Sequence, residues 1–195
     1  MYKYFGDSIC EPGRPVPEAG SKFCRMNCRI RIRAALTEKY FDMEEKMTDQ
    51  ENKYDCLHLD SQLCFPLYAC SKEIIRRYKP FLDSLDLTYT QYITMMAMWE
   101  HGKMNVKELG KCLFLDSGTL TPVLKKLEAK GYLHRDRSRT DERNLIVTIT
   151  EEGTRLRDRA LSVPGQMACC IDLSEDEAKM LYTVLYKILD HVSRD

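Results

Sequence analysis

The chain has 195 residues, 44% of them hydrophobic, and its 30 lysines and arginines balance its 30 aspartates and glutamates to a formal net charge of zero. That length and apolar content suffice for one globular domain with an appendage. Zero net charge excludes a protein that is drawn to nucleic acid by its overall field, so any DNA affinity must come from local clusters of basic residues.

No apolar run approaches the ~20 residues that a membrane-spanning helix needs, and no secretory hydrophobic segment is present. The nine cysteines are an odd number, which argues against a closed disulfide framework. We therefore expect no membrane association and a reducing, cytoplasmic location in which most thiols stay reduced. No motif of the GxGxxG type occurs, so we expect no cofactor.

Residues 1–46 differ from the rest in composition, because glycines and prolines interrupt the first part and a basic stretch follows. We expect a disordered or loosely helical extension. Two other interpretations stay open: a basic arm that contacts DNA or an anionic surface, or a mis-assigned start, with synthesis beginning at Met43 or Met47. Cys24 and Cys28 hint at metal ligands, but no His or further Cys completes a zinc set at the usual spacing, so we expect no metal.

Apolar residues at spacings of three and four predict a helix over residues 57–79 that closes before Pro80. Proline is tolerated in the first turn of a helix and costs ~3 kcal/mol deeper inside. Pro66 therefore predicts that the helix proper begins near Cys64 or bends there. In either case Cys64 lies near a helix start or break, where unpaired amides and the positive dipole end favour a thiolate.

Two further helices are predicted by their caps. Thr88 and Gln91 are spaced as a capping box that opens the first, and we expect Gly102 to end it. Asn105 can cap the second, which is short. The predicted buried face of the first helix consists of Tyr92, Met95, Met96 and Trp99.

Residues 116–150 predict a helix, a strand, a basic turn and a second strand. Asp116 or Ser117 can cap the helix, and Gly131 can end it. Its apolar stripe is formed by Leu120, Val123, Leu124 and Leu127, and its outer face carries hydroxyls and then cations: Ser117, Thr119, Thr121, Lys125 and Lys126.

This arrangement is typical of a winged helix-turn-helix: two short helices, the second polar on its outer face, and then a hairpin with arginines in its turn. Hydroxyls and lysines on a helix can enter a major groove, and arginines of a hairpin can reach phosphates or a minor groove. We therefore predict a mainly α fold with a small β-hairpin wing, an α+β class. The pattern alone leaves open an ordinary solvated helix followed by a hairpin.

The C-terminal part predicts a helix from Glu151 to Leu161 that ends at Pro164-Gly165, and then a terminal helix opened by a second capping box at Ser174. The apolar stripe of the terminal helix is long for one winged domain. Residues 57–79 and 151–193 are therefore predicted to supply a helical dimer interface. Packing within one chain is the alternative.

Four segments resemble the MarR family of winged-helix repressors: LCFPLY at 63–68, LDSGTLTP at 115–122, LKKLE at 124–128 and DER at 141–143. More narrowly they resemble its organic-hydroperoxide-sensing branch, of OhrR and SarZ type. The resemblance covers about residues 57–193, with a winged helix-turn-helix at about 88–150. It implies a homodimer on a pseudo-palindromic double-stranded DNA operator, with recognition helices in successive major grooves.

The resemblance also assigns DNA contacts. On the recognition helix they fall on Ser117, Thr119, Thr121, Pro122 and Lys125, with Lys126 on the same outer face. In the wing they fall on Arg137 or Arg139, and Asp141 matches a carboxylate that braces Arg143.

The family's sensing cysteine falls on Cys64, and its supporting phenols fall on Tyr78 and Tyr89, with Tyr68 one turn beyond Cys64. A phenolic hydroxyl donated to sulfur favours the thiolate, which is the form that attacks a peroxide. An organic hydroperoxide is therefore the expected inducer.

The resolving cysteine of two-cysteine members falls on Cys169, and Cys170 is its neighbour. The resemblance implies that Cys64 is oxidised to a sulfenic acid and then forms a disulfide with Cys169 of the other subunit, which releases DNA. Capping of the sulfenic acid by a small thiol is the alternative route.

Three other functions stay open. One is a MarR-type repressor that binds a phenolic ligand without reacting with it, and another is a redox-insensitive DNA-binding protein. A different class is a thiol peroxidase that uses Cys64. Because the sequence shows no paired acid and base, we expect no enzyme.

Overall fold

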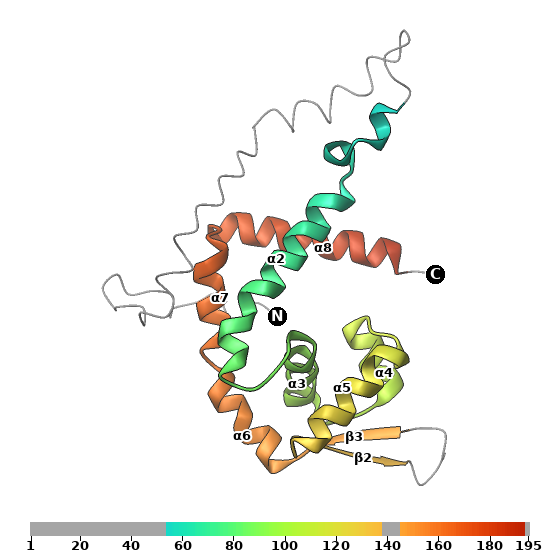
Figure 1. Ribbon diagram of the computed structural model, residues 1–195, viewed down its shortest axis with the longest axis vertical. Coiled ribbons are helices and arrows are strands. Elements are labelled where there is room, and N and C mark those ends of the chain that lie inside the picture. The colour runs from blue at the N-terminus through green and yellow to red at the C-terminus, as the bar shows by residue number, and fades with distance from the viewer. Residues whose placement is uncertain (1–53, 138–144, 194–195) are drawn as a thin grey trace, which may run out of the picture. The chain divides into compact units, whose positions relative to one another are not determined.

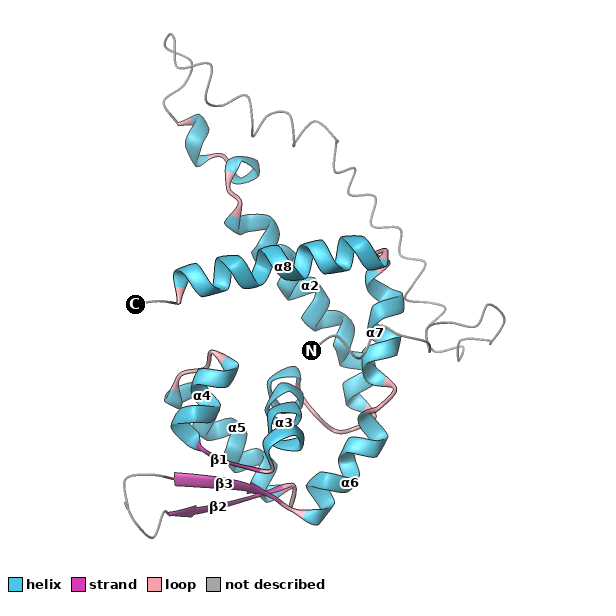
Figure 2. Cartoon of the chain, turned by 180° about the vertical axis from the view of Figure 1, so that it is seen from behind, coloured by secondary structure: helices cyan, strands magenta, loops and turns pink. Residues whose placement is uncertain are grey.

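The computed structural model describes residues 54–137 and 145–193 (Figure 1). Contacts divide this described part of the chain into two compact units, one of residues 54–73 with 175–193 and the other within residues 74–174. Helices dominate, and three short strands make one small sheet (Figure 2). The predicted fold class, mainly α with a small β wing, is confirmed.

The first unit contains two short 3-10 turns, η3 (Asp55–Leu57) and η4 (Leu59–Ser61), the beginning of α2 (Cys64–Asp83), and α8 (Glu175–Val192). The predicted helix start near Cys64 is confirmed, with Pro66 in the first turn of α2. The broader prediction of a helix over 57–79 is wrong at both ends.

At its C-terminal end α2 continues through Pro80 to Asp83. Proline there forfeits one backbone hydrogen bond. The last turn also carries Leu82, which is 1% exposed and belongs to the core of the second unit. Burial of a leucine side chain is worth about 1.5–3 kcal/mol, enough to offset most of the cost of the proline.

The second unit contains the rest of α2 and eight further elements. In chain order they are α3 (Tyr89–His101), β1 (Lys103–Asn105), α4 (Val106–Leu113), α5 (Ser117–Ala129), β2 (Leu133–Arg137), β3 (Leu145–Ile149), α6 (Glu151–Ala160) and α7 (Val163–Ile171). The sheet is antiparallel in the order β1-β3-β2, and Val147 of β3 pairs with Met104 on one side and Arg135 on the other.

Helix caps in this unit follow the predicted residues. Thr88 and Gln91 form the expected capping box at the start of α3, and Asn105 forms another with Glu108 at the start of α4. Gly102 ends α3 at a φ of 69°, in the left-handed region that favours glycine.

The core of this unit is built mainly from leucines of α2, α4 and α5 and from methionines of α3. The predicted stripe of α5 is confirmed, since Leu120, Leu124 and Leu127 are buried and Val123 packs against them. The predicted buried face of α3 is wrong at Met96, which is 45% exposed, whereas Met98 is fully buried. One residue of helix turns the side chain by about 100°, and Met98 lies on the side of Met95.

The prediction that Pro164-Gly165 ends a helix is also wrong. α6 ends at Ala160, and Pro164 lies in the first turn of α7. A first-turn amide has no partner within its helix, so a proline there loses nothing and favours a helix start.

The apolar stripe predicted for α8 lies at the surface of the chain. Its side chains keep about two fifths to two thirds of their area exposed, at Leu181, Val184, Leu185 and Val192. Within residues 54–137 and 145–193, the helices are all too short or too polar to cross a membrane.

Candidate DNA-reading surface and redox cysteines

α4 and α5 are joined by a tight turn. Phe114 follows α4 in the left-handed conformation, with a φ of 52°, and Asp116 then caps α5. Gly110 makes the close approach feasible, because a Cβ at that position would lie 2.8 Å from the carbonyl oxygen of Leu115. The pair is a helix-turn-helix, and β2 and β3 form the wing beside it.

The outer face of α5 brings the predicted recognition residues together. Ser117, Thr119, Pro122, Lys125 and Lys126 are exposed on it, and Thr121 is half-buried. This surface starts with hydroxyls and ends with two cations. The same helix buries its leucine stripe in the core, so the outer face is held in a fixed orientation.

Asp116 organises the start of this face. Its Oδ1 accepts the backbone amide of Thr119 at 2.8 Å, and its Oδ2 accepts the Thr119 hydroxyl at 2.9 Å. These hydrogen bonds from Thr119 hold the pKa of the Asp116 carboxyl below its usual value. One turn later, the Thr121 hydroxyl donates to the backbone oxygen of Ser117 at 2.7 Å.

Arg137, predicted as a wing contact, is exposed at the end of β2. The other predicted wing residues, Arg139, Asp141 and Arg143, lie outside the described residues.

Sequence reasoning missed a clamp between the recognition helix and the wing. Glu128 of α5 accepts the backbone amide of Arg135 at 3.0 Å and its guanidinium Nε at 2.9 Å. The guanidinium holds the pKa of the Glu128 carboxyl below its usual value. The pair flanks the turn at Gly131, and opposite charges across that turn are the sequence signal that could have revealed it.

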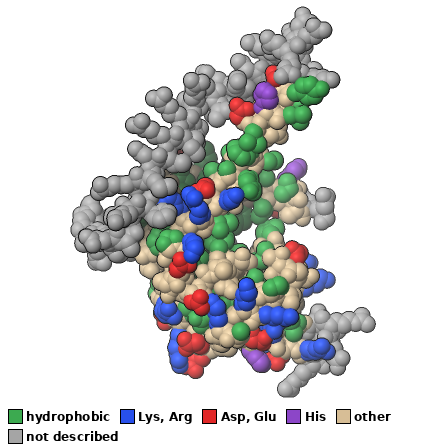
Figure 3. Space-filling view, in the orientation of Figure 1, with side chains coloured by type: hydrophobic (Ala, Val, Ile, Leu, Met, Phe, Trp, Pro, Cys, Tyr) green, Lys and Arg blue, Asp and Glu red, His purple; other side chains and the backbone are tan. Residues whose placement is uncertain are grey.

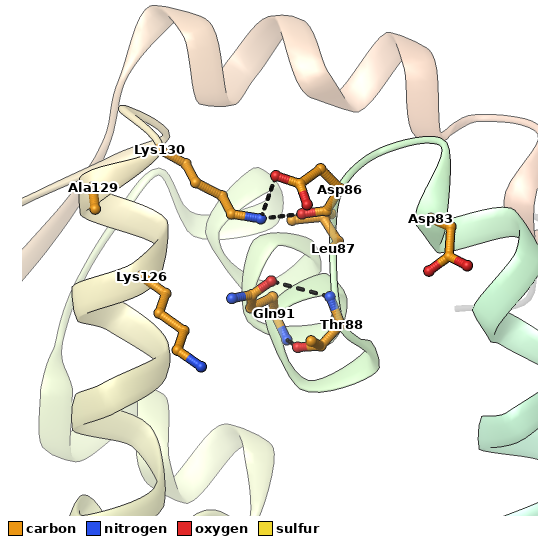
Figure 4. A pocket seen from close by; sticks show the side chains of 8 residues that line it. All are labelled: Asp83, Asp86, Leu87, Thr88, Gln91, Lys126, Ala129 and Lys130. Carbon is orange, nitrogen blue, oxygen red and sulfur yellow. Dashed lines mark hydrogen bonds and ion pairs between the residues drawn. The ribbon is translucent and has the colours of Figure 1, made fainter.

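A second missed contact joins the far end of α5 to the loop between α2 and α3. Lys130 forms an ion pair with the Asp86 carboxylate at 2.8 Å and also contacts the Asp86 backbone oxygen (Figure 4). The guanidinium of Arg159, from α6, donates to the backbone oxygen of Ser84 in the same loop at 3.0 Å. The recognition helix and α6 therefore both hold the loop that follows α2.

Beside this ion pair lies a pocket of about 500 Å³ between the C-terminal part of α5 and the start of α3 (Figure 4). Its lining is mainly charged or polar, and its apolar members are Leu87 and Ala129.

Cys64 is the first residue of α2 and is exposed, which confirms its predicted position at a helix start. Tyr68 lies one turn further and is 62% exposed, with the Lys72 ammonium 5.7 Å from its ring centre. Hydrophobic side chains reach the surface along this part of α2 (Figure 3), and Phe65 is 40% exposed. The thiol thus lies on a solvent-accessible, partly apolar surface.

Tyr78 and Tyr89 belong to an aromatic cluster in the second unit. Their ring centres lie 4.9 Å apart, and Tyr92 and Trp99 extend the cluster. Burial raises the pKa of both phenols above the ordinary value of 10.0. Their hydroxyls are protonated at neutral pH and can donate.

Tyr78 does not adjoin Cys64 of its own chain. The two residue numbers differ by 14 within one continuous helix, which corresponds to about 21 Å along the axis.

Cys169 and Cys170 are both exposed on α7, in the second unit. No disulfide joins the six cysteines of the part of the chain that the structure describes. No group of His, Cys, Asp or Glu side chains in residues 54–137 and 145–193 could hold a metal ion, and Cys24 and Cys28 lie outside these ranges.

The helix-turn-helix with its adjacent hairpin defines a winged-helix protein of the DNA-binding class, and comparisons with known proteins narrow that class. Residues 76–159 match the family described as transcriptional regulator SarA/Rot. The chain is 44% identical over 140 residues to the organic hydroperoxide resistance transcriptional regulator of Bacillus subtilis, which covers 72% of this chain and 95% of that protein. It is 47% identical over 128 residues to the regulator SarZ of Staphylococcus aureus, covering 66% and 84%.

Among solved structures, the chain resembles AbfR of Staphylococcus epidermidis. Reduced AbfR bound to DNA matches with a TM-score of 0.60 and 33% identity, over 72% of this chain and 99% of that one. A disulfide form of AbfR matches with a TM-score of 0.52 and 30% identity, over 72% and 96%. The chain therefore belongs to the MarR family of winged-helix regulators, in the organic-hydroperoxide-sensing branch that its sequence resembles.

Proposed function

We propose that the protein is a redox-sensing repressor that binds a pseudo-palindromic DNA operator as a homodimer and leaves it when an organic hydroperoxide oxidises Cys64. The observation that carries the proposal is the course of α2. Its first residue is the exposed Cys64, and its last turn buries Leu82 in the core that holds the recognition helix. A helix with both features can transmit a change at the thiol to the DNA-reading elements.

The proposed DNA contacts are the outer face of α5 and the wing. Ser117, Thr119, Thr121, Pro122, Lys125 and Lys126 would enter the major groove, and Arg137 and Arg139 would reach the flanking backbone or minor groove, with Asp141 bracing Arg143. The exposed apolar face of α8 supports the homodimer, because a monomer would leave that stripe in water.

The phenols that would support the Cys64 thiolate come from two sources. Tyr68 lies one turn away in the same helix, whereas Tyr78 and Tyr89 are too far along the chain to reach the Cys64 of their own subunit. We infer that Tyr78 and Tyr89 act on the thiol of the partner subunit. The sensor would then be assembled only in the dimer.

The chemistry proceeds in two steps. The Cys64 thiolate attacks the terminal peroxide oxygen, the O–O bond breaks, and a sulfenic acid and an alcohol form. The Cys169 thiolate of the partner then attacks the sulfenic sulfur, and water leaves as the disulfide forms. A disulfide form of AbfR supports this route. Disulfide bonding requires Cα atoms within about 7 Å, so the helices must move and the two recognition helices change their spacing.

Adjacent helical residues point about 100° apart, so Cys169 and Cys170 cannot both face the same partner thiol. We expect cumene hydroperoxide to produce a covalent dimer on a non-reducing gel for the wild type and for Cys170→Ser, and none for Cys169→Ser. A dimer that forms equally well without Cys169 would contradict the assignment, and DNA release without any covalent dimer would favour the small-thiol route.

The rival function, non-covalent induction by a phenolic ligand, needs a mostly apolar cavity. The pocket beside Lys130 is lined mainly by charged and polar side chains and does not favour it. A second rival is a thiol peroxidase. We infer that each thiol of the protein consumes one peroxide molecule without turnover, unlike an enzyme. We also infer that the protein acts in the cytoplasm and that residues 57–193 form its functional domain.

A mobility-shift titration on the DNA upstream of its own gene, at stated salt, tests the function. We expect cumene hydroperoxide to release the wild type, while Cys64→Ser stays bound at every oxidant concentration. A Cys64→Ser variant that is released like the wild type would favour the ligand-induced rival. Continuous peroxide turnover in the presence of a reducing thiol would favour the enzyme.

A further inference from the structure

The two threonines on the outer face of α5 both donate their hydroxyl protons to hydrogen bonds within the protein. Thr119 donates to the Asp116 carboxylate at 2.9 Å, and Thr121 donates to the backbone oxygen of Ser117 at 2.7 Å. A hydroxyl has one proton to donate and two lone pairs that accept. Both side chains therefore face outward as acceptors.

The hydrogen bond that the Thr119 hydroxyl donates is the stronger of the two. Its acceptor is a charged carboxylate that also binds the Thr119 backbone amide, at 2.8 Å, and hydrogen bonds to ionised groups are about twice as strong as neutral ones. Gly118 leaves room for this arrangement, since a Cβ there would lie 3.0 Å from Asp116 Oδ1. The hydroxyl of Thr119 thus has a defined polarity before any DNA arrives.

The four bases differ in the groups that they present to such an acceptor. In the major groove adenine and cytosine present an amino group that donates, whereas guanine presents only the acceptors N7 and O6 and thymine presents the acceptor O4. An acceptor facing another acceptor loses its hydrogen bond to water and gains none. A Thr119 hydroxyl that can only accept therefore distinguishes bases by whether they donate a hydrogen bond and not by their size.

We propose that Thr119 is a specificity-determining residue that selects an amino-bearing base, adenine or cytosine, at one position of each operator half-site, and that Asp116 is the positioning residue that sets the polarity of its hydroxyl. This inference rests on the proposed function, in which α5 reads the major groove. It adds the class of base that one side chain accepts.

Asp116→Asn is the variant that tests the mechanism. Asparagine caps helices as well as aspartate does, because its amide oxygen still accepts the Thr119 amide. Its other terminal atom is a donor, so Thr119 must accept from it and turn its own proton outward. The loss of one negative charge strengthens binding to every sequence alike, so it does not alter base preference.

Thr119→Val and Thr119→Ser are the matched controls. Valine keeps the shape and leaves the Asp116 cap on the backbone amide, but it neither accepts nor donates. Serine keeps the hydroxyl and loses only a methyl group. Thr121 is an internal reference, because its proton goes to a backbone oxygen that Asp116 does not touch.

The experiment selects operators from a library randomised in one half-site and then measures binding of reduced, full-length protein to the single-base variants by fluorescence anisotropy at fixed salt. At one position we expect the wild type and Thr119→Ser to prefer adenine or cytosine over guanine by about five- to tenfold. Asp116→Asn should shift the base preference at that position towards guanine or thymine by a similar factor. Thr119→Val should show less than about a twofold preference there.

Wild-type base preferences at every position in both Asp116→Asn and Thr119→Val would overturn the inference. If Asp116→Asn does not fold, as judged by circular dichroism, the retention of the preference in Thr119→Val still overturns it. Failure of the proposed function is a separate result: the wild type would then select no sequence at all from the library.

Discussion

Tyr92 shows how one side chain couples burial to pH. It is 3% exposed, and burial, with smaller contributions from Tyr78 and Tyr89, raises its pKa to about 12. The folded state then holds its proton more tightly than the unfolded state, whose tyrosines titrate near 10. The stability that this group contributes is present in full below pH ~10 and is lost as the pH rises towards about 12.

We therefore expect the free energy of unfolding to fall by roughly 2–3 kcal/mol between pH 9 and 12 through this residue, since one unit of pKa corresponds to ~1.4 kcal/mol. Urea denaturation at a series of pH values measures the slope. The Tyr92→Phe variant should show a visibly flatter profile over that range. A variant whose slope equals that of the wild type would show that the alkaline loss arises from other groups.

At this scale the sequence predicts which side chains face outward on α5 and where Cys64 lies, because helical periodicity and capping are local properties. It does not reveal the Glu128–Arg135 clamp or the Lys130–Asp86 ion pair. Each joins separate elements, and Asp86 pairs with a lysine 44 positions away. The ion pair depends on how the chain folds back, which no local pattern encodes, whereas the opposite charges on the two sides of the Gly131 turn are a local signal for the clamp.

At the scale of elements, two glycines in neighbouring helices have opposite roles. Gly153 lies in the first turn of α6, where a Cβ would be 2.2 Å from the backbone oxygen of Tyr132, and its own carbonyl accepts the Trp99 indole N–H at 2.8 Å. Gly165 lies in the first turn of α7 with no atom within 4 Å of such a Cβ. Helix propensity alone favours alanine over glycine at both, by up to ~1 kcal/mol.

Gly153→Ala should destabilise the protein by about 2 kcal/mol or more, because the clash is with backbone and the sheet must shift from α6. Gly165→Ala should be neutral or stabilising by up to about 1 kcal/mol. Thermal unfolding followed by circular dichroism measures both in one series. Equal effects of the two substitutions would mean that propensity, and not the close approach to Tyr132, decides at Gly153.

The elements were predictable where caps mark them and less so elsewhere. The starts of α3, α4 and α5 follow from Thr88, Asn105 and Asp116. β1 has three residues, too few to show alternation, and exists because β3 offers it a free edge. The helix ends predicted at Pro80 and Pro164 are wrong because the free-energy cost of a proline in a helix depends on nearby burial and on its position within the turn.

At the scale of the whole molecule, the exposed apolar face of α8 bears on the assembly. Leu181 is 45% exposed, and its neighbours on that face are similarly open. The proposed homodimer would cover them, and the proposed sensor requires it, because in that proposal Tyr78 and Tyr89 act on the Cys64 of the partner subunit.

Leu181→Glu should therefore raise the dimer dissociation constant at least tenfold, because it places a charge in an apolar interface. Operator affinity should fall with it, since one half-site alone binds weakly. Thr183→Glu adds the same charge on the opposite face of α8 and should leave both quantities within about twofold. Sedimentation velocity measures the dimer dissociation constant of both variants, and fluorescence anisotropy measures their operator affinity. A Leu181→Glu protein that remains a dimer would show that α8 does not form the interface.

In the proposed mechanism, the oxidation state of one thiol decides whether the protein holds DNA. The most direct measurement adds cumene hydroperoxide in substoichiometric steps to the DNA complex and follows, in the same samples, release by anisotropy and modification of Cys64 by peptide mass mapping. We expect the released fraction to rise in proportion to modified Cys64 and to be complete near one equivalent per subunit. Release that precedes modification of Cys64, or full modification with the complex intact, would contradict it.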